Sequence, residues 1–138
     1  MDDVIGVPPR AVTSLLRLDG LAVFVAAVAA FALTGGNWWL FALLILAPDL
    51  AFFAFPFGSR VAAQVYNFVH SYTWPLILGA AGMLTPIGWL LPVALIWAAH
   101  IGADRALGYG LKYPNSIETT HLGLIGKAGK AAKRANAG

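Results

Sequence analysis

The sequence predicts an all-α protein, a four-helix transmembrane bundle of up-down topology with both termini in the cytoplasm. Hydrophobic residues make up 59% of the 138-residue chain and charged residues only 11%, whereas soluble domains carry about 25% charge. The apolar residues fall into four runs, each near the roughly 20 residues that cross a hydrocarbon core. All nine Lys and Arg residues fall on one side of the predicted bundle.

The predicted helices span residues 15–34, 38–57, 61–83 and 87–107. They are separated by "GGN", "PFGSR" and "TPIG", where Gly and Pro supply turn geometry and end helices. Such short connections make consecutive helices antiparallel neighbours. The chain is therefore divided into an N-terminal cytoplasmic segment (1–14), a transmembrane domain (15–107), a cytoplasmic interfacial segment (108–126) and a basic tail (127–138).

The orientation follows from the distribution of basic residues. The loops between the first and second helices and between the third and fourth contain no Lys or Arg. The positive-inside rule then places both termini in the cytoplasm, and it accounts for Arg105 and Lys112 without any role in a site. The tail 127–138 is interpreted either as a disordered charged segment that helps to set this topology or as a contact for anionic lipids or a partner.

Ionisable residues interrupt the apolar runs at one level of the membrane. At 1.5 Å per residue, Asp49 lies about 16 Å from the outer face, His70 about 15 Å from the inner face and His100 about 18 Å from the outer face. Asp104 follows His100 by four residues and Asn67 precedes His70 by three, so each pair shares a helix face. A carboxylate at the bilayer centre costs roughly 2.5–3.5 kcal/mol, so these side chains are expected to converge inside the bundle.

The converged set of Asp49, His70, His100 and Asp104 has three open interpretations. It is a hydrogen-bonded network that keeps the helices in register, a divalent-metal site, or a proton or ion relay. Two imidazoles and one or two carboxylates match the ligands of Zn²⁺, Mn²⁺ or Fe²⁺, with a position left for water. The absence of cysteine excludes thiolate ligands.

Two prolines and one further histidine lie near this set in the sequence. Pro48 and Pro75 are either simply tolerated in membrane helices or kink them and free backbone carbonyls near the site. The segment 108–126 is predicted to be re-entrant or superficial. His121 is then either a solvated interfacial residue or, with Glu118, a further ligand or general base at the cytoplasmic mouth. Asn67 is the other candidate for a supporting group or base.

Several stretches of the chain resemble a known family. The strings "LLRLDGLAVF", "NWWLFALLILAPDL", "VYNFVHSYTWPLIL", "WAAHIGADRALGYGLKYP" and "THLGLIG" are similar to domain of unknown function 4260, a family of small bacterial four-helix membrane proteins. The resemblance covers about residues 14–126, and "HIGADRALGYGLKY" is its most specific piece. It implies a multi-pass protein of the bacterial cytoplasmic (inner) membrane and no established activity.

A looser resemblance concerns the order of the polar motifs. "PD", then "HS", then His with Asp four residues later is similar to the membrane-bound metal-dependent hydrolase family regulated by the SOS response repressor. That resemblance implies that Asp49, His70, His100 and Asp104 are the metal-associated positions. The chain departs from the family pattern at Ala51, where another acidic residue is common, and at Asn67, where His is common.

Two functions are expected to compete. In the first, a divalent metal lowers the pKa of a bound water for hydrolysis of a membrane-associated substrate. In the second, the protein is a non-catalytic accessory subunit of a larger membrane protein complex, and the polar set only holds the helices in register. Whether the protein is an enzyme is left open. The expected partners are the lipid bilayer and, in the second case, other membrane subunits, with no nucleic acid.

Overall fold

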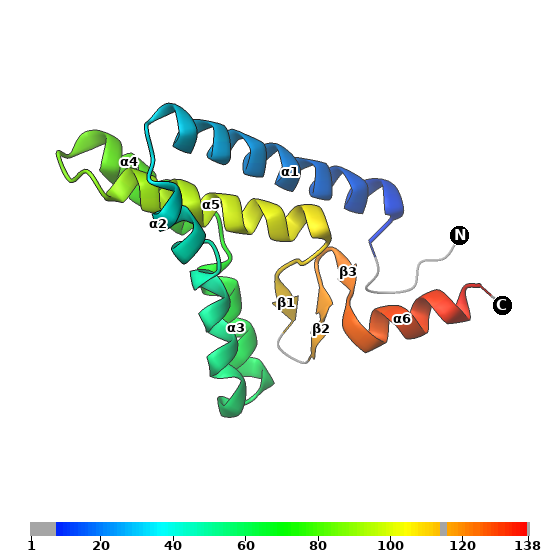
Figure 1. The fold of residues 1–138 in the computed structure, drawn as a ribbon. Coiled ribbons are helices and arrows are strands. Elements are labelled where there is room, and N and C mark those ends of the chain that lie inside the picture. The colour runs from blue at the N-terminus through cyan, green and yellow to red at the C-terminus, as the bar shows by residue number, and fades with distance from the viewer. Residues whose placement is uncertain (1–7, 114–115, 138) are drawn as a thin grey trace.

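The computed structural model describes residues 8–113 and 116–137 and is mostly helical, as the sequence predicts. Residues 1–7 of the predicted N-terminal segment lie outside this part. The chain is built from these helices: α1 (Arg10–Leu33), α2 (Trp38–Leu44), the 3₁₀ helix η1 (Ala47–Phe57), α3 (Ser59–Val69), α4 (Thr73–Leu84), α5 (Leu90–Leu107) and α6 (Gly126–Ala135). Helices α1 and α5 lie side by side along the length of the molecule (Figure 1).

Among the described residues, three helical segments are long and apolar enough to cross a membrane: Arg10–Leu33, Trp38–Phe57 and Leu90–Leu107. Large apolar side chains cover much of their surface; Leu33 is 88% exposed and Phe53 is 77% exposed. Apolar patches of this extent are unusual on soluble monomers and are the normal lipid-facing surface of membrane proteins. The protein is therefore a membrane protein, as predicted.

The antiparallel contact between α1 and α5 depends on two glycines. A Cβ atom at Gly20 would collide with the Cβ of Arg105, and one at Gly102 would lie 2.7 Å from the carbonyl oxygen of Gly20. In addition, the Arg17 side chain donates from Nε to the carbonyl of Ala106. Small residues let the backbones of membrane helices approach closely, and the two longest apolar helices pack in this way.

The prediction of one continuous helix over 61–83 is wrong. Helix α3 ends at Val69 and α4 begins at Thr73, so His70 lies in the break. Pro75 explains the break, because its ring clashes with the carbonyl four residues earlier, at Ser71, and it has no N–H to donate. In the first turn of α4 that missing donor is tolerated.

The second apolar run breaks for the same reason. Helix α2 ends at Leu44, and the 3₁₀ helix η1 begins at Ala47 with Pro48 in its first turn. Because both runs bend, η1 and α3 pack on each other and point away from α1, α4 and α5 (Figure 1). The four apolar runs therefore do not form four parallel rods, in contrast to the predicted up-down bundle.

A small antiparallel sheet follows α5, which corrects the prediction of a purely α-helical chain. Its strands, in the order β1-β2-β3, are β1 (Lys112–Tyr113), β2 (Ser116–Thr120) and β3 (Gly123–Leu124). Asn67 holds the sheet to α3, because its amide group accepts from the Lys112 N–H at 2.6 Å and donates to the Lys112 carbonyl at 2.7 Å. Most of the predicted basic tail is the helix α6.

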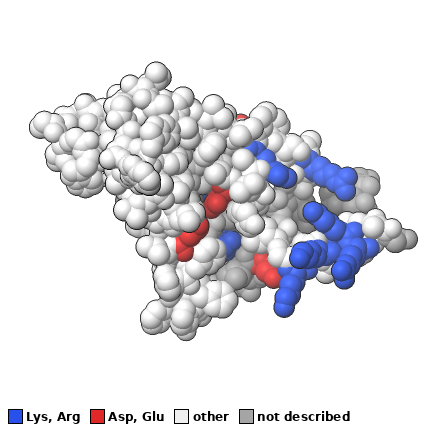
Figure 2. All heavy atoms as spheres, viewed as in Figure 1, with Lys and Arg blue, Asp and Glu red and all other residues white. Residues whose placement is uncertain are grey.

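Charge is distributed unevenly along the molecule (Figure 2). Lys and Arg side chains gather at the end that carries α6 and the start of α1, whereas the opposite end is uncharged on the face shown. The sequence agrees, because the turns 34–37 and 85–89 at that opposite end contain no Lys, Arg, Asp or Glu.

Candidate metal centre

The predicted set of two histidines and two aspartates meets at one point. His70 Nε2 lies 3.1 Å from His100 Nε2, 3.3 Å from Asp104 Oδ2 and 3.5 Å from Asp49 Oδ1. His100 Nε2 lies 3.3 Å from Asp49 Oδ1 and 3.4 Å from Asp104 Oδ2. One ligand atom of each residue lies within 4.8 Å of all the others. The convergence that the sequence predicted is thereby confirmed.

The contact made by Nδ1 of each imidazole indicates its tautomer. His70 Nδ1 lies 2.9 Å from the carbonyl oxygen of Tyr66, and His100 Nδ1 contacts the carbonyl oxygen of Ile45. A carbonyl oxygen only accepts, so each Nδ1 carries the proton. In the neutral ring, each Nε2 then presents a bare lone pair to the point where the carboxylates meet, which is the form in which histidine binds metals.

The carbonyl that orients His100 is free because of Pro48. In a 3₁₀ turn the Ile45 carbonyl would accept from the nitrogen of residue 48, which in proline has no hydrogen. The N–H of Asp49, the α-helical alternative, donates instead to Leu46. The freed Ile45 oxygen accepts from His100, so the helix break that moves Asp49 into place also orients a second member of the site.

The spacing matches four-coordinate metal binding. Zn–N and Zn–O bonds of about 2.0–2.1 Å in a tetrahedron place ligand atoms about 3.3–3.4 Å apart. Five of the six separations among these four atoms are given above, and they span 3.1–3.5 Å. A single proton could join only one pair of these atoms, whereas one cation could contact all four.

Access to the centre is from the side of Asp49. The side chains of His70, His100 and Asp104 are 0%, 4% and 17% exposed, whereas that of Asp49 is 38% exposed. Asp49 is also the only one of the four on the 3₁₀ helix η1. A substrate or water would therefore approach past this carboxylate.

Tyr66 is a supporting residue that sequence reasoning missed. Its ring stacks on the His70 imidazole at 3.7 Å between centroids, and its hydroxyl donates to Asp104 Oδ2 at 3.3 Å. It thus fixes two of the four residues, His70 in the break after α3 and Asp104 on α5. The signal was available, because Tyr66 precedes His70 by four residues and so shares its helix face.

The sequence-based prediction that Arg105 and Lys112 only set the membrane topology is wrong. Both are buried. The Arg105 guanidinium donates to the carbonyl of His70 at 2.8 Å and to that of Tyr109 at 2.9 Å, so it satisfies a carbonyl left free by the helix break. Lys112 Nζ lies 4.2 Å from the centroid of the Tyr66 ring, in a cation–π contact. Burial lowers the pKa of Lys112, and the charges of Asp104 and Asp49 oppose this shift.

The two candidate bases lie elsewhere. Both amide atoms of Asn67 bond the main chain of Lys112, so Asn67 anchors the sheet. His121 Nδ1 accepts from the N–H of Leu111 at 2.9 Å. His121 lines a different cavity, of about 380 Å³, together with Asp19 and Tyr72. Burial, and then the charge of Arg105, lower the pKa of His121.

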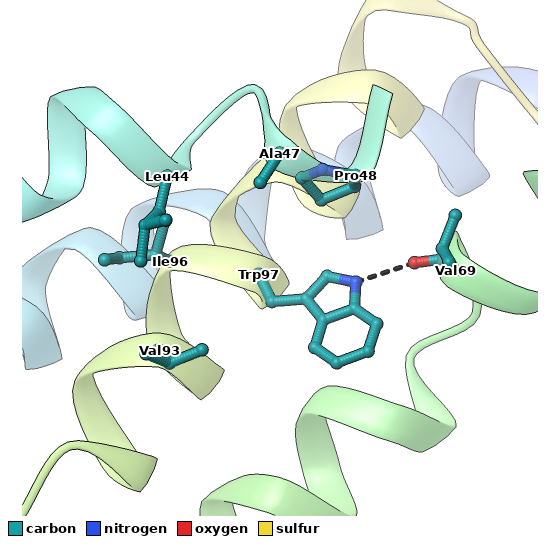
Figure 3. Close-up of a pocket in the computed structure, with 7 residues that line it drawn as sticks. All are labelled: Leu44, Ala47, Pro48, Val69, Val93, Ile96 and Trp97. Atoms are coloured by element: carbon teal, nitrogen blue, oxygen red, sulfur yellow. Dashed lines mark hydrogen bonds between the residues drawn. The ribbon is translucent and has the colours of Figure 1, made fainter. Parts of the chain in front are cut away.

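An apolar cavity of about 240 Å³ is lined by the segments that carry Asp49, His70 and His100, without these residues themselves (Figure 3). Its lining is Leu44, Ala47, Pro48, Val69, Val93, Ile96 and Trp97. The indole Nε1 of Trp97 donates to the Val69 carbonyl at 2.6 Å, which satisfies the carbonyl at the end of α3.

Comparison with known proteins gives one result. No curated protein and no solved structure matches the chain at the significance expected of a relative. A family model, described as a domain of unknown function, matches residues 13–125. That range contains the four residues of the centre, Tyr66, and every residue that lines the apolar cavity. Because the match covers most of the chain, the protein belongs to the family of domain of unknown function DUF4260.

Proposed function

We propose that the protein binds one divalent metal ion through Asp49, His70, His100 and Asp104 and uses it to hydrolyse a membrane-associated substrate. One observation carries the proposal. Both imidazoles turn Nδ1 toward a carbonyl oxygen, so in their neutral form the two bare Nε2 atoms lie 3.1 Å apart and 3.3–3.5 Å from the carboxylate oxygens. Without a cation these acceptors repel one another.

The charge of the set suits a divalent ion in the membrane. Two neutral imidazoles and two carboxylates carry a charge of −2, which a divalent cation cancels. The ion would thus neutralise the set itself, while the buried cations Arg105 and Lys112 keep their own contacts to carbonyl oxygens and to the Tyr66 ring. Nitrogen and oxygen ligands in near-tetrahedral spacing favour Zn²⁺, with Mn²⁺ and Fe²⁺ as the other candidates.

The catalytic part of the proposal rests on the exposure of Asp49. A divalent ion held here would lower the pKa of a water molecule that it binds. Asp49 is the most exposed of the four side chains, so the substrate would enter on its side. Tyr66 would hold Asp104, and stacking would hold His70, while the exposed carboxylate moves.

The metal is tested first. The protein is purified in detergent without chelator, and its metal content is measured by inductively coupled plasma mass spectrometry. We expect about one divalent ion per chain in the wild type and in His121→Ala, and at least a tenfold lower content in His100→Ala. His121→Ala is the matched control, because His121 lies outside the centre. Folded wild type without metal, or unchanged content in His100→Ala, would overturn the proposal.

The reaction is tested separately on metal-loaded protein in mixed micelles. One fluorogenic long-chain ester and one fluorogenic lipid phosphodiester serve as substrates. Hydrolysis of either is expected to stop on chelation and to return when the metal is restored. If metal-loaded protein hydrolyses neither, the hydrolase part is wrong.

A second candidate function has one observation in its favour. Four protein ligands that fill a tetrahedron are typical of structural zinc sites. On this reading the protein is an accessory subunit of a larger membrane complex, and the ion holds η1, α3 and α5 together. Metal removal would then lower the thermal midpoint, and the metal-loaded protein would show no turnover.

We also infer the orientation in the bacterial cytoplasmic membrane. Helices α1 and α5 run antiparallel, and the end of the molecule that carries α6 also carries most of the Lys and Arg side chains (Figure 2). The positive-inside rule supports a cytoplasmic location for that end, and with it both termini.

A further inference from the structure

The lining of the apolar cavity consists mostly of hydrocarbon side chains. None of the side chains in its lining is charged (Figure 3). The one polar group among these side chains, the indole N–H of Trp97, is already bonded to the carbonyl of Val69. A polar or charged ligand placed here would lose its hydrogen bonds to water and gain none.

The cavity and the metal centre are built from the same segments. Pro48 directly precedes Asp49, and Val69 directly precedes His70. Ile96 lies one helical turn before His100 on α5. The segments that line the cavity therefore also carry Asp49, His70 and His100.

The size and surroundings of the cavity determine what can fill it. An apolar protein cavity of about 150 Å³ stays dry and takes up benzene, so a cavity of about 240 Å³ holds a larger hydrocarbon group. Leu43 and Leu46, which flank Leu44 on the same segment, are exposed on an apolar surface that faces lipid. Hydrocarbon chains are thus at high concentration beside this segment of the cavity lining.

We propose that this cavity binds the hydrocarbon chain of a membrane lipid, and that the lipid ester or phosphoester bond next to the chain is the one presented to the metal centre. The choice of substrate rests on the proposed hydrolytic function. Binding of the chain does not, because the lining contains none of the four ligand residues.

The test is photo-crosslinking in lipid nanodiscs. The probe is a phosphatidylglycerol with a diazirine on one acyl chain, and crosslinked peptides are quantified by mass spectrometry. In the wild type we expect enriched crosslinks at the cavity lining. Val93→Trp fills the cavity and should lower these crosslinks about tenfold, since several buried methylene groups lose their place. The matched control is Leu33→Trp, at an 88% exposed position on α1, which should leave them unchanged.

Further arms separate the two proposals. His100→Ala should keep the cavity crosslinks, because the chain binds without metal. A free fatty acid with the same diazirine distinguishes the source of the chain: stronger crosslinking by the phospholipid supports a lipid substrate, and exclusive crosslinking by the fatty acid overturns it. Should Val93→Trp fail to fold, Ala47→Leu narrows the cavity more gently.

If the wild type and the variants Val93→Trp and Ala47→Leu give equal crosslinking in the cavity, the cavity does not bind a lipid chain, even if the protein holds metal and shows turnover. Conversely, the finding that the protein holds no metal would overturn the proposed hydrolysis. A loss of crosslinks in Val93→Trp and Ala47→Leu would then still support binding of a lipid chain in the cavity.

Discussion

At the scale of single residues, the centre depends on backbone carbonyls that point imidazole lone pairs inward. Tyr66 and Ile45 accept from the two Nδ1 atoms, and Arg105 satisfies the carbonyl of His70. Partners of this kind fix the tautomer and orientation of metal-binding histidines, and their loss typically costs ten- to a hundredfold in metal affinity.

The first prediction concerns the Tyr66 hydroxyl. Tyr66→Phe keeps the ring on His70 but removes the hydrogen bond to Asp104, so the metal dissociation constant should rise about tenfold. Metal affinity is measured by competition with a chromophoric chelator. The matched control is Tyr72→Phe, because the Tyr72 hydroxyl is buried without a hydrogen-bond partner among the described residues. Equal affinities in the two variants would contradict this role of Tyr66.

The second prediction concerns the titration of His121. Its pKa lies below the usual 6.5, because burial, and then the charge of Arg105, disfavour the charged ring. Unfolded chains therefore take up a proton near pH 6.5 that folded chains do not, so the free energy of unfolding falls as the pH drops below about 6.5. His121→Gln should flatten this part of the stability profile. An NMR titration that gives a pKa at or above 6.5 would refute the prediction.

At the scale of elements, helix breaks and close helix contacts position the centre. Breaks before Pro48 and Pro75 bring Asp49 and His70 toward α5. On another face of α5, Gly102 packs against Gly20 of α1, so α5 is held by a close backbone contact while it presents His100 and Asp104.

The third prediction tests this helix contact. Gly20→Ala places a methyl group against Arg105 Cβ and 2.9 Å from the main chain of Gly102 and Ala106. Overpacking of this kind costs about 1–3 kcal/mol, so the thermal midpoint in detergent should fall. Gly88→Ala is the control, since a Cβ atom at Gly88 meets nothing within 4 Å. A midpoint that is unchanged by Gly20→Ala would mean that the helices pack less closely than described.

At the scale of the whole molecule, the separation of charge from apolar surface determines how the protein inserts. In the proposed orientation the uncharged turns 34–37 and 85–89 cross the membrane, and the basic end near α6 stays in the cytoplasm by the positive-inside rule.

The fourth prediction is a labelling pattern. The chain has no cysteine, so single-cysteine variants report directly on location. A membrane-impermeant maleimide should label Gly88→Cys in intact spheroplasts and Ala137→Cys only after permeabilisation. The reverse pattern would place the termini outside.

Sequence reasoning reached the membrane class and the four members of the centre. Apolar content and run length depend on composition, and the i, i+4 spacing of His100 and Asp104 depends on helix geometry alone. Sequence reasoning failed for features that depend on contacts between residues far apart in the chain. Arg105 and Lys112 are basic residues at a helix end in the sequence, but both are buried beside the centre in the fold. The sheet around His121 was missed because its strands are only a few residues long.

By itself the sequence determined that this protein belongs in a membrane and that two histidines and two aspartates must avoid lipid, because the cost of burying charge in hydrocarbon is independent of fold. Pro48 and Pro75 even mark where the helices break. Only the tertiary structure decided which partner each freed carbonyl takes. It thereby decided which imidazole nitrogen is bare, since a hydrogen bond between residues 55 positions apart is set by packing and not by local sequence.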